Sequence, residues 1–200
     1  MKHFLVLLFF SWWAAVTVFA QKPVELTEVG KDRFEASFLS GGELRVHLRS
    51  GEIRVTGTEG NTIRVHYEGK EVDKIDDVRV SLKTWNNTGE LHVSGGPRNT
   101  FRIVVEVPKN LDLYLRVPAG EVEVEGVTGN KDVELHAGEL TVAIGSPSDY
   151  ARVDASVSTG ELDADPFDVS KGGLFRSFKT QGHGKYRLHA HVGAGQLTLR

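Results

Sequence analysis

The sequence predicts a single all-β domain. We expect a β-solenoid, that is, a β-helix-like stack of short strands, with a β-sandwich as the alternative. Three observations support an all-β fold. Apolar and polar residues alternate with a period of two along most of the chain, and helical spacing of apolar residues is nearly absent. One short phrase recurs seven times at the start of strands, and glycine is frequent, with 22 residues in 200.

Composition excludes several classes of function. The chain has no cysteine, which rules out disulfide frameworks, thiol nucleophiles and cysteine-ligated metals. Its formal net charge of -3 argues against a nucleic-acid partner, because nucleic-acid binders carry a basic excess. With 40% hydrophobic residues, the chain can form a packed core.

Residues 1–20 resemble a cleaved secretory signal peptide. Lys2 supplies the positive charge, an apolar run follows, and Val18-Phe19-Ala20 provides a cleavage site. We expect the mature chain to begin at Gln21, to lie outside the cytoplasm (in the periplasm, on the cell surface or in the medium) and to retain no transmembrane segment. An uncleaved anchor is the alternative, because the apolar stretch has about 17 residues, near the lower limit for a membrane span.

The rest of the chain divides into a lead-in strand or cap over residues 21–39 and a strand-repeat domain over residues 40–200. Each expected strand has one apolar and one polar face, as in a half-buried sheet. The apolar faces are Leu44/Val46/Leu48, Ile63/Val65/Tyr67, Val78/Val80/Leu82, Phe101/Ile103/Val105/Val107, Leu111/Leu113/Leu115/Val117, Val133/Leu135/Ala137, Leu140/Val142/Ile144, Val153/Ala155/Val157, Tyr186/Leu188/Ala190 and Leu197/Leu199.

The repeated phrase is glycine, then Glu or Gln, then an aliphatic residue. Glycine permits a positive φ or a close backbone approach, the next side chain points outward, and the aliphatic side chain points into the core. Several spacings between copies fall near multiples of about 18–20 residues, the length of a short solenoid rung, which favours the solenoid. The copies begin at Gly42, Gly51, Gly89, Gly120, Gly138, Gly160 and Gly195.

Phrases such as Ser50-Gly51-Glu52-Ile53, Ala137-Gly138-Glu139-Leu140 and Thr159-Gly160-Glu161-Leu162 resemble those of a bacterial β-strand-repeat family catalogued as "putative adhesins" within a domain of unknown function. Members of that family more often carry Asp after the glycine, where this chain has Glu. The resemblance covers roughly residues 40–200. It implies a β-helix-like fold outside the cytoplasm and supplies no binding residues.

Charge is distributed unevenly along the chain. Residues 111–170 carry 3 Lys and Arg against 13 Asp and Glu, whereas residues 171–200 carry 6 basic residues and no acidic one. We expect the acidic block, residues 121–168, to be a solvated face. A Ca²⁺ site is the alternative, because clustered carboxylates suit this cation, although no known calcium-binding loop motif is present.

Histidines offer the only other candidate metal ligands. His189 and His191 lie two residues apart, so both could face one metal, with His183 as a third ligand. We expect instead an outward polar face, and we place His47, His66, His92 and His136 on the surface as well. The sequence therefore predicts no catalytic, cofactor-binding or metal-binding residues and no cofactor.

Residues 166–178 interrupt the alternation. Phe167, Leu174, Phe175 and Phe178 are irregularly spaced around a Lys-Gly-Gly segment. We expect a long loop that folds its aromatic side chains over the open end of the stack as a cap. A hydrophobic patch for docking a partner is the alternative.

These observations favour an exported, non-enzymatic protein with a structural, binding or adhesin-like role at the cell envelope. Its partner would be a macromolecule or a glycan. The alternative is a carbohydrate-binding or lyase-like, carbohydrate-active β-helix protein.

If the acidic block is a solvated face, Ca²⁺ will leave the melting temperature of the purified protein unchanged relative to a chelator. A ligand that binds only the folded state raises this temperature by mass action. Thermal unfolding followed by circular dichroism, with Ca²⁺ and with chelator, provides the measurement. A clear rise with Ca²⁺ would contradict this expectation and favour the carbohydrate-binding or lyase-like alternative.

Overall fold

The computed structural model describes residues 24–69, 75–96 and 101–200, which form one 13-stranded sheet. The helices within these ranges are two single 3₁₀ turns, η1 (Pro147–Asp149) and η2 (Asp165–Phe167). The all-β prediction is confirmed. No helix of the described ranges is long and apolar enough to cross a membrane. The predicted leader, residues 1–20, lies outside these ranges.

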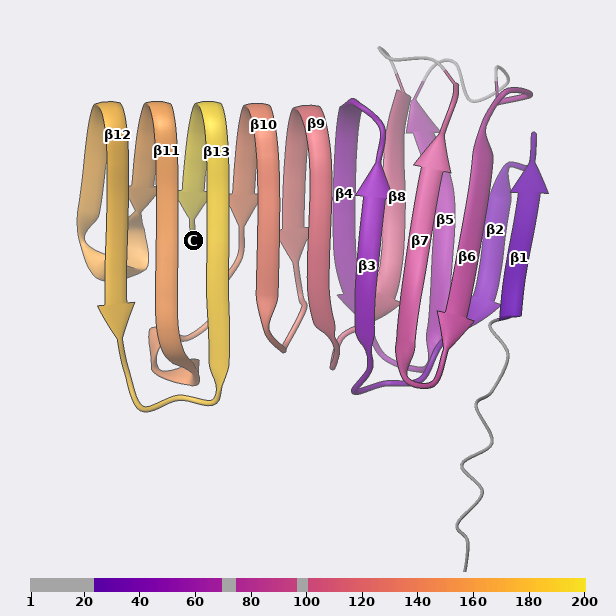
Figure 1. Cartoon of the computed structure of the whole chain (residues 1–200), viewed down its shortest axis with the longest axis horizontal. Coiled ribbons are helices and arrows are strands. Elements are labelled where there is room, and N and C mark those ends of the chain that lie inside the picture. Colours follow the sequence, from indigo (N-terminus) through magenta and orange to yellow (C-terminus); the bar gives the residue numbers. More distant parts are fainter. Residues whose placement is uncertain (1–23, 70–74, 97–100) are drawn as a thin grey trace, which may run out of the picture.

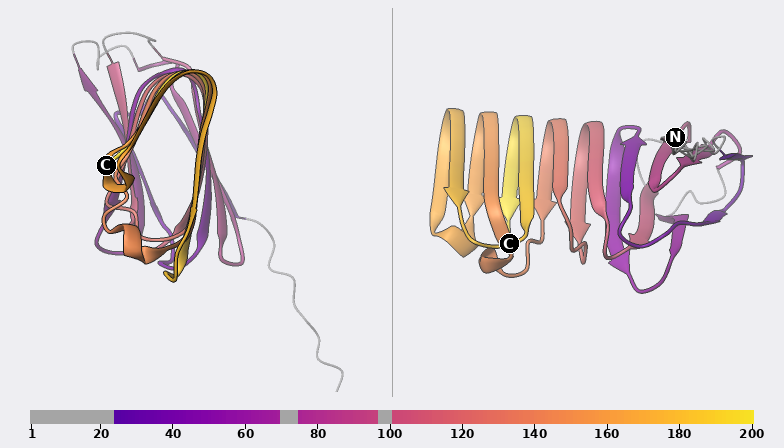
Figure 2. Two further views of the ribbon diagram at one scale, coloured as in Figure 1. Left: turned by 90° about the vertical axis from the view of Figure 1, so that its left-hand side faces the viewer. Right: turned by 60° about the horizontal axis from the view of Figure 1, so that its bottom comes forward.

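The sheet folds over along one edge, so that two layers face each other across a common core (Figures 1 and 2). Long strands bend at the fold and contribute to both layers: β9 (Asp112–Glu125), β10 (Lys131–Val142), β11 (Tyr150–Ala164), β12 (Val169–Gln181) and β13 (Tyr186–Leu199). Shorter strands lie in one layer each: β1 (Val24–Val29), β2 (Arg33–Ser37), β3 (Glu43–Leu48), β4 (Gly51–Thr58), β5 (Thr62–Gly69), β6 (Arg79–Trp85), β7 (Thr88–Ser94) and β8 (Phe101–Pro108).

We call the layer nearer the viewer in Figure 1 the front layer. It contains β1, β6, β7 and β3, followed by the first halves of β9, β10, β13 and β11. The back layer contains β2, β5, β8 and β4, followed by the second halves of the same long strands. The outer surface of the front layer is the front face.

The sheet bends at a column of glycines along this edge. Gly51, Gly120, Gly138, Gly195 and Gly160 are register partners on successive strands. Their φ angles lie between 125° and 144°, a region that other residues rarely adopt. A Cβ atom on Gly138 would lie 1.9 Å from the carbonyl oxygen of Gly120. We call these five residues the glycine column.

The remaining two copies of the repeated phrase have a different role. Gly42 and Gly89 lie beside the start of β3 and near the start of β7, and neither has a positive φ. A Cβ atom on Gly89 would lie 2.7 Å from the ring of Phe38, so this glycine makes room for a core side chain. In all seven copies the aliphatic residue is buried, as predicted: Leu44, Ile53, Leu91, Val122, Leu140, Leu162 and Leu197.

The strands do not stack in chain order. The last strand, β13, lies between β10 and β11 and is parallel to both. The parallel stacking of β9, β10, β13 and β11 is what a solenoid predicts, whereas β1, β2 and β12 join the sheet through antiparallel pairs. The pairing thus contains elements of both predicted arrangements.

The segment predicted as a long loop over residues 166–178 is mostly a strand, so that prediction is wrong. β12 pairs antiparallel with β11 along nearly its whole length and ends the sheet. Phe167 and Phe178 pack on the core with ring centroids 5.0 Å apart, whereas Leu174 and Phe175 are exposed. Tertiary pairing with β11 overrides the irregular apolar spacing that predicted a loop.

One charged residue occupies a core position within the described ranges. Lys131 is 2% exposed and pairs in register with Leu113 and Leu188. Its ammonium group donates to the Tyr150 hydroxyl (2.8 Å), which donates to the carbonyl oxygen of Ile144 (3.1 Å). Burial lowers the pKa of Lys131 to about 8 and raises the pKa of Tyr150 to about 12.

Gly138→Ala will destabilise the protein by about 2–4 kcal/mol, because the new methyl group meets a neighbouring backbone carbonyl at a positive φ. Gly60→Ala is the matched control, since Gly60 has a φ of 109° but no atom within 4 Å of the added Cβ. Urea unfolding measures both variants. Equal losses would show that the close contact contributes nothing.

The unfolding free energy of the wild type will rise by about 2 kcal/mol relative to Lys131→Met between pH 7 and pH 9.5. The folded-state pKa of Lys131 is lowered to about 8, so between about pH 8 and its ordinary pKa of 10.5 the unfolded chain binds more protons than the folded chain. Stability therefore increases with pH in this window. Urea unfolding at both pH values tests this, and parallel pH profiles would contradict it.

Candidate functional site

The front face carries two rows of polar side chains that run across the strands. They arise because in-register strands place outward residues side by side. The first polar row is Glu90, Arg45, Tyr114, Asp132, His189, Asp154 and Lys179. The second polar row is His92, His47, Arg116, Glu134, His191 and Ser156.

A hollow of about 720 Å³ lies over the first polar row. Strands β3, β7, β9, β10, β11 and β13 all contribute to its lining, which includes Arg45, His47, Tyr114, Asp132, Arg152 and His189. These side chains project from strands, not from loops, so the sheet fixes their spacing.

Arg116 organises the middle of the front face. Its guanidinium group donates to Asp132 Oδ1 at 2.7 Å and lies 3.1 Å from Glu134 Oε1. The same group lies 3.5 Å from the centroid of the Tyr114 ring, a cation–π contact. The side chain of Arg116 is only 19% exposed, and its contacts hold outward-facing groups of β9 and β10 in place.

Asp154 forms a second fixed group at the β11 side of the hollow. Lys179 lies 2.9 Å and Arg152 3.1 Å from Asp154 Oδ2. Partial burial alone would raise the pKa of Asp154, but the hydrogen bonds from Lys179 and Arg152 outweigh it and hold the pKa below its usual value. Asp154 therefore stays ionised well into the acid range.

Two imidazoles and a carboxylate meet at the other side of the hollow. His47 and His92 are register partners on β3 and β7, and their rings stack with centroids 4.7 Å apart and an interplanar angle of 12°. Glu90 Oε1 lies 3.0 Å from His92 Nε2 and 3.9 Å from His47 Nε2. Burial first, and then the charge of His92, lower the pKa of His47, while the hydrogen bond from His92 lowers the pKa of Glu90.

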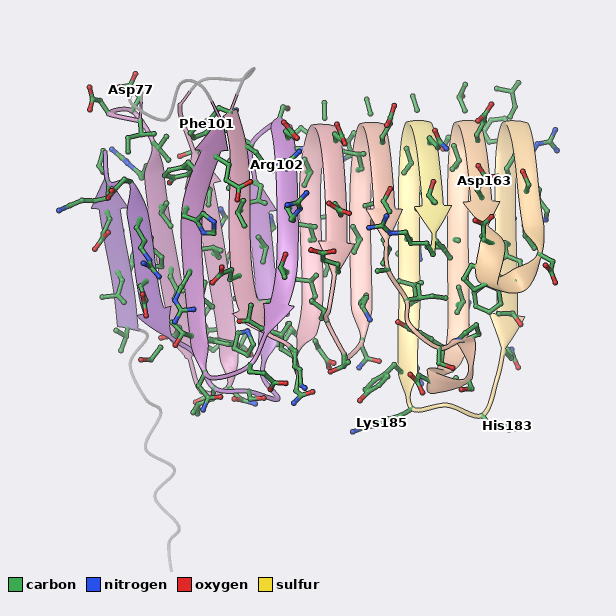
Figure 3. The ribbon with its side chains drawn as sticks, turned by 180° about the vertical axis from the view of Figure 1, so that it is seen from behind. Asp77, Phe101, Arg102, Asp163, His183 and Lys185 are labelled. Atoms are coloured by element: carbon green, nitrogen blue, oxygen red, sulfur yellow. The ribbon has the colours of Figure 1, made fainter. Side chains whose placement is uncertain are left out.

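The histidines singled out from the sequence do not form one site. His189 and His191 both face outward, but His191 Nδ1 is hydrogen-bonded to Ser156 Oγ (2.9 Å), and His189 lies near Glu134 and Asp132. His183 lies in the loop between β12 and β13, at the edge opposite the glycine column (Figure 3). Sequence spacing could not show that β10 supplies carboxylates beside His189.

The structure separates the acidic block into exposed and paired groups. Glu121, Glu139 and Glu161 follow glycines of the column and are exposed along the folded edge. Glu123, by contrast, lies on the back layer and forms ion pairs with Arg54 (3.0 Å) and Arg200 (2.5 Å). The block therefore does not converge on one point, and Figure 3 shows Asp163 on the outer side of the back layer near β12.

The solved structures that are similar to this chain include the following two. One is described as a putative cell adhesion protein from Clostridium sporogenes, with a TM-score of 0.49, 16% sequence identity and coverage of 89% of this chain and 99% of that chain. The other is described as a putative adhesin from Bacteroides fragilis, with a TM-score of 0.33, 10% identity and coverage of 88% and 97%.

No family model and no curated protein matches the chain. The resemblance to the β-strand-repeat family therefore stays a prediction from the sequence. At these identities and TM-scores, the two similar structures say nothing about ligands. Any inference about function therefore rests on the side chains of the front face.

Proposed function

We propose that this protein is a non-enzymatic, adhesin-like binding module of the cell envelope, and that its front face binds an oligosaccharide chain of a partner. The fold proposed with it is a β-solenoid closed at its ends by antiparallel strands. The observation that carries the proposal is the hollow on the front face, whose polar side chains are held in fixed positions by ion pairs.

The chemistry of the hollow suits a hydrated, nearly neutral ligand. Acidic and basic side chains are interspersed along the first polar row, so the face has no large excess of either charge. Sugar hydroxyl groups both donate and accept hydrogen bonds. They can therefore use the carboxylates of Asp132 and Asp154 and the guanidinium groups of Arg45 and Arg152 together. A polyanion such as nucleic acid would need a basic surface.

Fixed side chains also favour binding energetically. Long charged side chains lose rotamer freedom when a ligand orders them, at a cost of about 0.5–1.5 kcal/mol each. Arg45 and Arg152, which line the hollow, already make ion pairs with Glu43 and Asp154 in the free protein, so this cost is reduced. The volume of about 720 Å³ is large enough for a short oligosaccharide segment.

Arg152→Ala will weaken glycan binding by about tenfold, because Arg152 lines the hollow and its loss leaves Asp154 held by Lys179 alone. Arg54→Ala is the matched control, since Arg54 forms a similar ion pair with Glu123 (3.0 Å) on the back layer. A glycan array identifies the ligand, and titration of that ligand compares the variants. Retained binding in Arg152→Ala, or equal losses in both variants, would contradict the proposed face.

The non-enzymatic part of the proposal has its own test. The ligand found on the array is incubated with the protein, and its length is followed by chromatography. An unchanged ligand supports a binding module. Shortened products, or products with a new double bond from lyase chemistry, would overturn it in favour of a carbohydrate-active protein.

A further inference from the structure

The strongest unassigned chemistry lies where β3 and β7 meet. His47, Glu90 and His92 offer two imidazole nitrogens and a carboxylate oxygen that all lie within 4.8 Å of one another. We propose that these three residues form a Zn²⁺ site on the front face. The proposal does not depend on the oligosaccharide ligand, because it concerns the binding of the metal alone.

The backbone already places the three ligands correctly. His47 and His92 face each other across a parallel strand pair, and Glu90 lies two residues before His92, on the same face of β7. In a tetrahedral site with bonds of about 2.0–2.1 Å, neighbouring ligand atoms are about 3.3 Å apart. Glu90 Oε1 lies 3.0 Å from one imidazole nitrogen and 3.9 Å from the other, so side-chain rotations alone can close the site.

The set of donors suits zinc in particular. Two neutral imidazoles and one carboxylate match the three-ligand arrangement of zinc sites that keep a further position open. Ca²⁺ and Mg²⁺ prefer oxygen ligands and a larger number of them. The three side chains are between about one third and one half exposed, so the metal can enter from solvent.

The two neighbouring arginines do not prevent metal binding, because both are already paired. Arg45 donates to Glu43 at 2.7 Å, and Arg116 is held by Asp132 and Glu134. Lys83 on β6 is the register partner of Glu90. It reinforces the ionised carboxylate, which is the form that binds a metal.

A second group, Asp132, Glu134 and His189, also brings three ligand atoms together. Here Arg116 lies 2.7 Å from Asp132 Oδ1 and 3.1 Å from Glu134 Oε1, so a metal would have to displace the guanidinium group from both carboxylates. The His47 group requires no such displacement. This difference selects it and makes His189 a useful comparison.

A bound zinc ion would keep an open position beside the hollow, since His47 and Glu90 both line it. Three protein ligands leave room for water or for one donor atom from a partner. The metal could thus add one directed contact to a surface whose other contacts are hydrogen bonds and ion pairs.

Isothermal titration of the purified protein with Zn²⁺ tests the site. We expect one zinc ion per chain, and we expect His47→Ala and His92→Ala each to weaken binding at least about tenfold. His66→Ala is the matched control, because His66 faces Glu68 on the same strand (3.8 Å) but has no second imidazole beside it. His189→Ala, from the second group, should also leave binding unchanged.

Co²⁺ provides an independent readout, since a tetrahedral site gives it strong visible absorption that either histidine variant should remove. All the altered side chains lie outside the core, and circular dichroism confirms that each variant is folded. Absence of zinc binding by the wild type overturns the proposal. So does a loss in His66→Ala or His189→Ala equal to that in His47→Ala.

Discussion

Close backbone contact at the glycine column is the constraint on which the rest of the structure depends. At Gly160 a Cβ atom would lie 1.7 Å from the carbonyl oxygen of Gly195, and at Gly195 it would lie 1.9 Å from that of Gly138. Only residues without a side chain can turn at this point and still pair with the next strand. Each long strand must therefore bend at the same position, which locks the strands in register in both layers.

This register creates the front face. Once the bends are aligned, residues at equal distances from the glycine lie side by side across the strands, and outward positions become continuous rows. Opposite charges on adjacent strands then pair, as Arg116 does with Glu134, and like residues stack, as His47 does with His92. The same alignment brings Glu121 and Glu139 together on the folded edge, where exposure to water moderates their repulsion.

The position of β13 links the end of the chain to its middle. β10 and β11 follow each other in the chain but do not pair with each other, because β13 lies between them and pairs with both. Arg200 adds two contacts beyond the end of β13. Its backbone amide donates to the carbonyl oxygen of Val142, and its guanidinium group forms an ion pair with Glu123. Pairing of this kind between distant segments is typical of slowly folding β proteins.

Much of the fold and little of the candidate site follow from the sequence alone. The period of two determines which residues are buried, because successive side chains in any strand point to opposite faces, and the glycine phrase marks where the chain can bend. The sequence does not show which strands pair with each other. His47 and His92 are 45 positions apart, β13 is inserted out of order, and β12 is a strand only because β11 pairs with it. Lys131 can be buried because the hydroxyl group of Tyr150, from the next strand along the chain, accepts a hydrogen bond from its ammonium group. Side-chain direction is a local property of the backbone, whereas the neighbour that a side chain meets depends on which strands pair, and only the tertiary structure decides that.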